Sequence, residues 1–262
     1  MGKVETITEI ELNLQDMQEV IFRDLGTMDY RQAWEYQESL LQENVRIKSE
    51  WRNRVSDSKD PLDPGAIGQP PAHTTHHLLF VEHPPVYTLG KSGHAENLLI
   101  DENTIRQQDI HFFRTNRGGD ITFHGPGQIV GYPILDLERF YTDIGKYLRS
   151  LEEMVILTLA EYNIRGERSP GETGVWIDPA IKGRERKICA IGIRCSRWIT
   201  MHGFAFNINT DLSHFTQMIP CGIRDKQATS LKNELGREIP LAEVKTKLER
   251  NFEIVFDVKL VS

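Results

Sequence analysis

The stretch Arg117-Gly118-Gly119-Asp120-Ile121-Thr122-Phe123-His124-Gly125-Pro126-Gly127-Gln128 places four glycines and a proline within twelve residues. Glycine and proline weaken the interior of a helix or a strand, so this composition is typical of a loop. Glycine also permits positive φ and lets backbone N–H groups approach a ligand closely. The stretch therefore predicts a loop that holds a ligand, with Arg117 and His124 as polar contacts; a plain turn between two strands is the alternative.

The segments on both sides of this loop have the patterns of strands and amphipathic helices. Short apolar or β-branched runs bounded by turn residues predict strands, and apolar residues at helical spacing predict helices. The expected strands are 77–82, 86–89, 110–115, 120–123, 128–135, 174–177, 187–194 and 198–207, and the expected helices are 29–51, 142–162 and 241–252. Because strands and helices do not alternate strictly, we expect an α+β fold with mixed, largely antiparallel sheets flanked by helices.

The length of 262 residues and the hydrophobic fraction of 39% suit a globular chain with a substantial core. We expect an N-terminal extension at 1–28, a single domain at 29–262 and, within that domain, a Pro/Gly-rich excursion at 57–72. The longest apolar run, 154–160, is far shorter than a membrane span, so no membrane association is expected.

The charge and the cysteine content narrow the functional class further. A net charge of -7 argues against nucleic-acid binding. The three cysteines form no C-x-x-C pair, which favours a reducing, cytoplasmic location over a disulfide framework. One stretch is basic, and it is either a solvated face or a docking patch for an acidic partner. Its charged residues are Lys182, Arg184, Glu185, Arg186, Lys187, Arg194 and Arg197.

Two patterns that resemble a phosphate site and a metal site lack residues that such sites need. Gly90-Lys91-Ser92 resembles the end of a phosphate-binding loop, but Pro85 stands where that motif needs glycine. The histidines His73, His76 and His77 lie beside a Pro-rich stretch without cysteine or carboxylate companions. We expect no metal and no cofactor.

The three cysteines have different surroundings. Cys189 lies in an apolar strand and is expected in the core, and Cys195 at a strand end is expected to be an incidental exposed thiol. Cys221, within Pro220-Cys221-Gly222, would present its sulfur on a sharply turned loop and is a candidate nucleophile.

A thiol nucleophile needs a nearby cation, because a free cysteine pKa of about 8.5 leaves little thiolate at neutral pH. The candidates are His124, His202, His214 and Lys187. Lys187 heads an apolar strand, where it is either a partly desolvated lysine near a cleft or simply a solvated strand end.

Several separated motifs together resemble the lipoyl(octanoyl) transferases, over about 74–223. The motifs are Glu82-His83-Pro84-Pro85-Val86-Tyr87-Thr88-Leu89-Gly90, Arg117 to Gln128, Gly131-Tyr132-Pro133, Gly174-Val175-Trp176, Lys187-Ile188-Cys189-Ala190-Ile191-Gly192-Ile193-Arg194, His202-Gly203-Phe204-Ala205-Phe206-Asn207 and Pro220-Cys221-Gly222. The segment before Asp29 and the excursion at 57–72 are additions to the family pattern.

The resemblance implies a fold similar to biotin and lipoate protein ligases and a catalytic domain at 29–262. It implies cofactor-free transfer of an octanoyl group from octanoyl-acyl carrier protein to a lysine of lipoyl domains, through an acyl-cysteine thioester. Acceptors would be lipoyl domains of 2-oxoacid dehydrogenases and the glycine cleavage H protein, and the enzyme would be a cytoplasmic monomer.

The same resemblance implies roles for individual residues. Cys221 matches the nucleophile and Lys187 the lysine that lowers its pKa. The segments that match substrate-lining positions are Arg117, Gly118, Gly119, Asp120, Ile121, Thr122, Phe123, His124, Ala190, Ile191, Gly192, Gly203, Phe204 and Ala205.

The small residues among them would let backbone line a narrow slot for an eight-carbon chain. Discrimination should be graded below eight carbons, because each missing methylene weakens binding only a few-fold. Above eight carbons it depends on the closed end of the slot.

Three other functions are alternatives to be separated by experiment. An ATP-dependent lipoate or biotin ligase needs no acyl-accepting thiol. A non-catalytic acyl-carrier binding module needs neither Cys221 nor Lys187. A lipoyl amidotransferase would move acyl groups between proteins.

Overall fold

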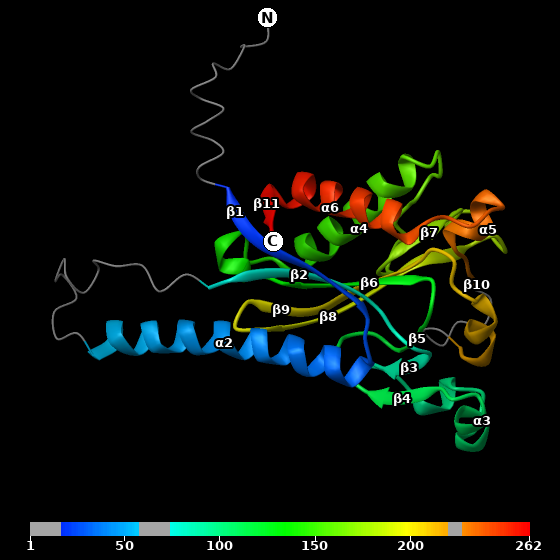
Figure 1. Ribbon diagram of the computed structural model, residues 1–262, viewed down its shortest axis with the longest axis horizontal. Coiled ribbons are helices and arrows are strands. Elements are labelled where there is room, and N and C mark those ends of the chain that lie inside the picture. Colours follow the sequence, from blue (N-terminus) through cyan, green and yellow to red (C-terminus); the bar gives the residue numbers. More distant parts are fainter. Residues whose placement is uncertain (1–16, 58–73, 220–226) are drawn as a thin grey trace, which may run out of the picture.

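The computed structural model of the protein describes residues 17–57, 74–219 and 227–262. Two sheets and the helices around them form the described part (Figure 1). The larger, mixed sheet has the order β10-β8-β9-β6-β2-β1-β11, with β7 paired to β8, and the smaller has the order β4-β3-β5. These sheets and helices confirm the expected α+β fold. The predicted excursion at 57–72 falls, apart from its first residue, outside the described residues.

The elements that the sequence predicts lie close to their expected positions, and strands β1, β10 and β11 and helices α3 and α5 add to them. The strands are β1 (Gln18–Thr27), β2 (His76–Glu82), β3 (Val86–Leu89), β4 (His111–Arg114), β5 (Ile121–His124), β6 (Gln128–Ile134), β7 (Val175–Ile177), β8 (Arg186–Ser196), β9 (Ile199–Asn207), β10 (Gln227–Ala228) and β11 (Val258–Val261). The helices are α2 (Tyr30–Asp57), α3 (Glu102–Gln107), α4 (Ile144–Ala160), α5 (Leu231–Leu235) and α6 (Leu241–Phe256).

The segment expected as an N-terminal extension includes a strand of the larger sheet. Strand β1 pairs in parallel with β2 on one side and with β11 on the other. Among its side chains, that of Val20 is fully buried. Backbone hydrogen bonding rather than an alternating apolar pattern therefore holds β1, which explains why no strand was predicted there.

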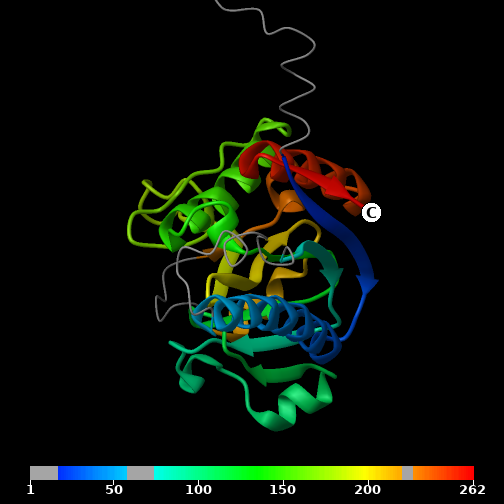
Figure 2. The ribbon, with the colours of Figure 1, turned by 90° about the vertical axis from the view of Figure 1, so that its left-hand side faces the viewer.

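The larger sheet is covered differently on its two faces. Helices α4 and α6 bury Leu151, Leu248 and Phe252 against one face, in the largest core cluster. Helix α2 lies on the opposite face, on the side of the smaller sheet, and packs Ala33 and Leu41 there (Figure 2). Asp29 caps α2 as predicted, since its Oδ1 accepts a hydrogen bond from the backbone N–H of Arg31 at 2.8 Å.

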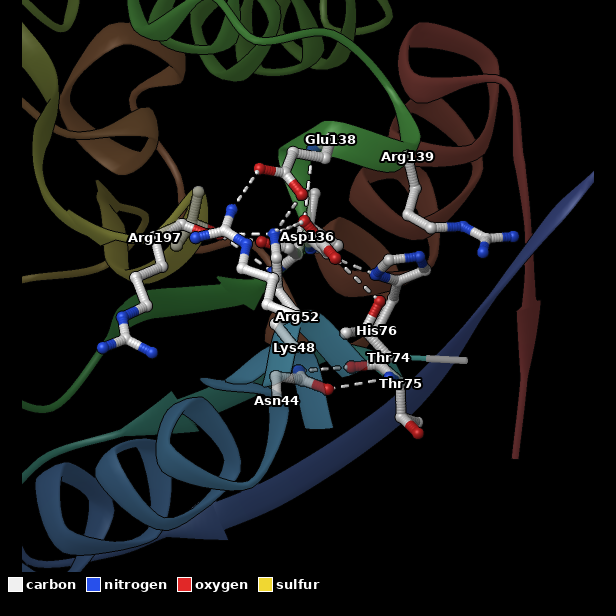
Figure 3. A network of polar contacts seen from close by, with 12 residues as sticks. Asn44, Lys48, Arg52, Thr74, Thr75, His76, Asp136, Glu138, Arg139 and Arg197 are labelled. Carbon is white, nitrogen blue, oxygen red and sulfur yellow. Dashed lines mark hydrogen bonds and ion pairs between the residues drawn. The ribbon is translucent and has the colours of Figure 1, made fainter. Parts of the chain in front are cut away.

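A buried ionic network fastens the C-terminal half of α2 to the sheet (Figure 3). The Lys48 ammonium lies 2.7 Å from Asp136 Oδ1 and 2.8 Å from Glu138 Oε2, and it donates to the Arg197 carbonyl at 2.9 Å. Thr74 Oγ1 donates to the other Asp136 oxygen at 2.9 Å. The side chains of Lys48 and Asp136 are only 8% and 4% exposed, so their charges are compensated almost entirely within the protein.

Candidate functional site

A cavity of about 520 Å³ opens between the two sheets near the start of α2. Its walls come from the Gly-rich loop, from β8 and β9 and from Tyr30 of α2. All the predicted substrate-lining residues except Phe123 border it, and so does Lys187. Cys221 lies in 220–226, outside the described residues. The structure thus brings together segments separated by about 90 positions, while their roles in catalysis stay predictions.

Phe123 does not border the cavity, unlike the other residues that were predicted to line the substrate site. Strand β5 alternates, so that Thr122 and His124 border the cavity and Phe123 points the other way. Its ring, 1% exposed, packs with Tyr87 and stacks on His214 at 4.2 Å between ring centroids. We therefore assign Phe123 to the core of the smaller sheet.

Small residues on neighbouring strands form the floor of the cavity. Ala190 of β8 pairs with Ala205 of β9, and Gly192 pairs with Gly203. Paired residues of an antiparallel ladder share a face, so these positions lie side by side. Farther along β9 the same face carries Met201, which packs in the cluster under α2. Because Met201 is followed on this face by the small residues Gly203 and Ala205, space for the cavity remains above the strand.

The Gly-rich loop is fixed directly to β8. The Gly118 N–H donates to the Ile193 carbonyl at 2.8 Å. A Cβ on Gly192 would lie 2.8 Å from the Gly118 carbonyl oxygen, so only glycine permits this approach. Arg117 is 7% exposed, and its guanidinium donates to the Thr88 carbonyl at 2.6 Å and to Thr88 Oγ1 at 2.9 Å. Arg117 thus holds the loop against β3.

Besides charged residues such as Arg117 and Lys187, the polar part of the wall and the layer behind it contain neutral histidines and tyrosines. His83 Nδ1 donates to the Met28 carbonyl at 2.8 Å, and its Nε2 accepts from the Tyr132 hydroxyl at 2.7 Å. His124 Nδ1 donates to Gln128 Oε1 at 2.8 Å. Gln128 Nε2 in turn donates to the Phe123 carbonyl at 3.1 Å and to Asn207 Oδ1 at 2.8 Å. Each donor meets an acceptor, which fixes the ring orientations.

Burial keeps these groups uncharged. It lowers the pKa of His83 to about 4 and that of His202 to about 3, and it holds the pKa of His124 well below the ordinary value of 6.5. Nearby Arg117 lowers the last two further. Burial also raises the pKa of Tyr30 to about 12. At neutral pH these histidines therefore add no charge to the cavity.

Lys187 occupies a different part of the cavity, beside the short strand β10. Its Nζ lies 4.6 Å from the centroid of the Trp176 ring, a cation–π contact. Among the described residues Lys187 makes no ion pair with a carboxylate. Its backbone carbonyl accepts from the Thr229 N–H at 2.9 Å, which fixes the strand. The ammonium thus borders the cavity and is not neutralised by an ion pair with any carboxylate of the described residues.

The basic stretch at 182–197 does not form one patch. Most of it runs along β8, whose eleven residues extend roughly 33 Å at 3.3 Å per residue. Arg186 pairs with Glu234 and Asp178, both at 2.7 Å, and Arg194 pairs with Glu38 at 2.6 Å. The charges thus lie toward opposite ends of a strand and are partly neutralised, and a role in docking an acidic partner stays a prediction.

The remaining cysteines and histidines have structural surroundings. Cys189 is fully buried, which confirms its core placement, whereas Cys195 is half-buried rather than exposed. His73 lies outside the described residues, and His76 Nδ1 accepts from the Asp136 N–H at 3.2 Å. Within the described ranges no group of three or more histidine, cysteine, aspartate or glutamate side chains is arranged to hold a metal.

Comparison with known proteins shows the family to which the chain belongs. The model for the lipoyl protein ligase A/B catalytic domain matches residues 29–253. The chain is 55% identical to an octanoyltransferase of Christiangramia forsetii, over 92% of this chain and 97% of that one. It is 53% identical to an octanoyltransferase of Flavobacterium johnsoniae, over 91% and 97% of the two chains. The chain belongs to the octanoyltransferases of this family. Octanoyltransferases are acyltransferase enzymes.

Solved structures support the fold assignment. A bipartite lipoate protein ligase from Thermoplasma acidophilum superposes with a TM-score of 0.62 at 17% identity, covering 94% of this chain and 88% of that one. A lipoate-protein ligase A bound with ATP gives a TM-score of 0.60 at 14% identity, covering 94% and 90%. In the described part of this octanoyltransferase family member, no helix is long and apolar enough to cross a membrane.

Sequence reasoning gave no role to several residues of the site. Tyr132 and Trp176 lie in motifs that carried the resemblance, yet their types alone did not predict a cavity wall. Tyr30 was expected only as an apolar residue of a helix. Asn116 and Gln37 gave no signal, because their importance depends on contacts across 86 and 165 positions with His202.

Proposed function

We propose that this protein transfers an octanoyl group from octanoyl-acyl carrier protein to a lysine of a lipoyl domain, with Cys221 as the covalent carrier. The observation that carries the proposal is Lys187, an ammonium without a described carboxylate partner, at a cavity with a floor of small residues. Met218, three residues before Cys221, and Gln227, six residues after it, also border this cavity. Chain connectivity therefore supports a meeting of thiol and ammonium.

In the first half-reaction, the Cys221 thiolate attacks the octanoyl carbonyl, and the bond to the sulfur of the carrier's prosthetic arm breaks. Lys187 stabilises the thiolate beforehand and gives its proton to the leaving thiolate. One thioester replaces another, so the step is nearly thermoneutral. In the second half-reaction, the neutral amine of the acceptor lysine attacks the carbonyl carbon of the acyl-Cys221. The bond between this carbon and the Cys221 sulfur breaks, the thiolate is regenerated, and Lys187 takes up the proton that the amine loses. Formation of the amide drives this step forward.

The test is incubation with octanoyl-acyl carrier protein and an apo lipoyl domain without ATP, followed by mass spectrometry of all three proteins. We expect octanoyl on the acceptor lysine and, without acceptor, on Cys221. Cys221→Ala should abolish both products, whereas the matched control Cys195→Ser should keep them. Octanoylation that requires ATP would identify a ligase instead.

Lys187 is tested separately. Lys187→Met should slow iodoacetamide labelling of Cys221 near neutral pH, because the thiolate loses its cation. Peptide mapping separates this thiol from Cys195. An unchanged labelling rate would rule out the proposed effect of Lys187 on the thiol pKa.

A further inference from the structure

His202 has a backbone conformation that is unusual inside a strand. It lies within β9, yet its φ is +60°, in the left-handed region that favours glycine. Its ring packs against Trp34 of α2, on the face that also carries Met201, although strand alternation would place adjacent residues on opposite faces. The left-handed backbone therefore turns the imidazole toward α2 and the cavity. Strain of this kind persists where the surrounding structure holds it, and it is concentrated at functional sites.

Two buried contacts hold His202 in this conformation. Its backbone N–H donates to Gln37 Oε1 at 3.0 Å, and Gln37 is 1% exposed. Its ring Nε2 donates to Asn116 Oδ1 at 2.7 Å, at the start of the Gly-rich loop. Helix α2, strand β9 and the loop thus meet at one side chain, which is itself 2% exposed. Because its backbone and its ring are both held by buried contacts, the His202 side chain has little freedom to move when a ligand binds.

The strand register places His202 at one end of the cavity. It pairs with Ile193, and these two are the last cavity residues on β9 and β8 in that direction. Lys187 lies six residues before Ile193 on β8, which corresponds to roughly 20 Å along the strand at 3.3 Å per residue. Beyond His202 the face continues as the packed cluster of Met201 and Ile199 under α2. The cavity therefore ends at the imidazole, opposite Lys187.

We propose that His202, held by Gln37 and Asn116, is the end wall of the acyl cavity and determines the longest acyl chain that the enzyme accepts. This inference rests on the proposed function, which puts the thioester at the Lys187 end and the terminal methyl at the other. Because burial and Arg117 keep the ring neutral, a methyl group can contact it without facing a charge.

The test is the chain-length profile of His202→Gly. Glycine adopts positive φ without strain, so this variant removes the ring while keeping the backbone. We expect the ratio of dodecanoyl to octanoyl transfer to rise on the order of tenfold, which is about the worth of two buried methylenes. His202→Asn, with a smaller side chain that tolerates the left-handed region, should shift the ratio less. His94→Gly, at a side chain that is 71% exposed, is the matched control and should not shift it.

A second readout is independent of transfer. Thermal stabilisation by free saturated fatty acids should reach its maximum at a longer chain in His202→Gly than in the wild type. If His202→Gly slowed all chain lengths equally, or left both profiles unchanged, the end-wall role would be overturned. If the wild-type protein transferred no acyl group while the fatty-acid profile still shifted, the proposed function would fail and the end wall would stand.

Discussion

Two buried polar clusters hold helix α2 to the larger sheet, and they are built differently. The network of Lys48, Asp136 and Glu138 near the C-terminal half of the helix uses full charges that compensate one another (Figure 3). The wall near the N-terminal half uses His83, His124 and His202, which are neutral at ordinary pH. The first cluster therefore compensates its charges within the protein, whereas the histidines of the second are kept neutral by burial.

This difference has an energetic reason. A buried ion pair is tolerated when its partners remain together, and removing one of them leaves an uncompensated charge. A hydrogen-bonded neutral group costs less when disturbed, because no charge is left behind. The ionic cluster should therefore respond more strongly to mutation than the neutral wall does.

The largest effect is expected for Lys48→Met, which keeps the aliphatic stem and removes the ammonium. Asp136 then stays buried with Thr74 and without its cation, so the free energy of unfolding should fall by about 3–5 kcal/mol. Urea denaturation measures this loss. A decrease below about 1 kcal/mol would show that the network contributes little. Lys48→Arg, which retains the charge, is the control and should recover part of the loss.

A smaller effect is expected in the neutral wall, for Gln128→Leu. This change removes the acceptor of His124 and the donor to Asn207 and Phe123, while the volume stays similar. Unsatisfied buried groups should lower the free energy of unfolding by about 1–3 kcal/mol. The His124 Nδ1 proton, followed by NMR, should then exchange faster. A loss as large as that of Lys48→Met would contradict the ranking of the two clusters.

Acid should weaken the neutral wall in a defined pH window. The pKa of His83 in the folded protein is about 4, lowered by burial from an ordinary value of 6.5. As the pH falls below 6.5, the unfolded chain binds the proton first, so stability declines until about pH 4 and then levels off for this group. His83→Gln should reduce the slope of stability against pH by at most about 1.4 kcal/mol per pH unit. An identical slope in both proteins would contradict a neutral buried His83.

The contrast between the clusters also shows what the sequence can reveal. The long helices α2, α4 and α6 and the strands β2 to β9 follow from local periodicity, and the strands at 86–89 and 128–134 were predicted almost to the residue. Strands β1, β10 and β11 were missed, because β1 and β11 are held mainly by their partners and β10 has two residues. Lys48 and Asp136 are 88 positions apart, so no local pattern marks their pairing. Periodicity within a short window therefore predicts helices and strands, whereas a buried cluster made by residues far apart in the chain needs the three-dimensional structure.

The same reasoning applies to the candidate site. The Gly-rich loop and Lys187 were identified from motifs, since their composition or resemblance is visible in a short window. From the sequence, His202 was one of four candidate cations beside a thiol and the first residue of one resemblance motif, with no role of its own. Its placement at the cavity end depends on a φ of +60° and on Gln37, which lies 165 positions away. Residues that act through backbone conformation leave little trace in a single sequence.

The smallest effect is expected for salt, and it tests the charges outside both clusters. Arg186 and Arg194 are paired with carboxylates and lie near opposite ends of β8, so they do not combine into one attractive surface. Initial rates of octanoyl transfer from carrier protein should therefore change less than about threefold between 0.01 and 0.15 M salt, although the Debye length shortens from about 30 to 8 Å. The double variant Lys182→Ala with Arg184→Ala should behave like the wild type. A steep decline in rate with salt, lost in that double variant, would show that the exposed end of the basic stretch steers the carrier after all.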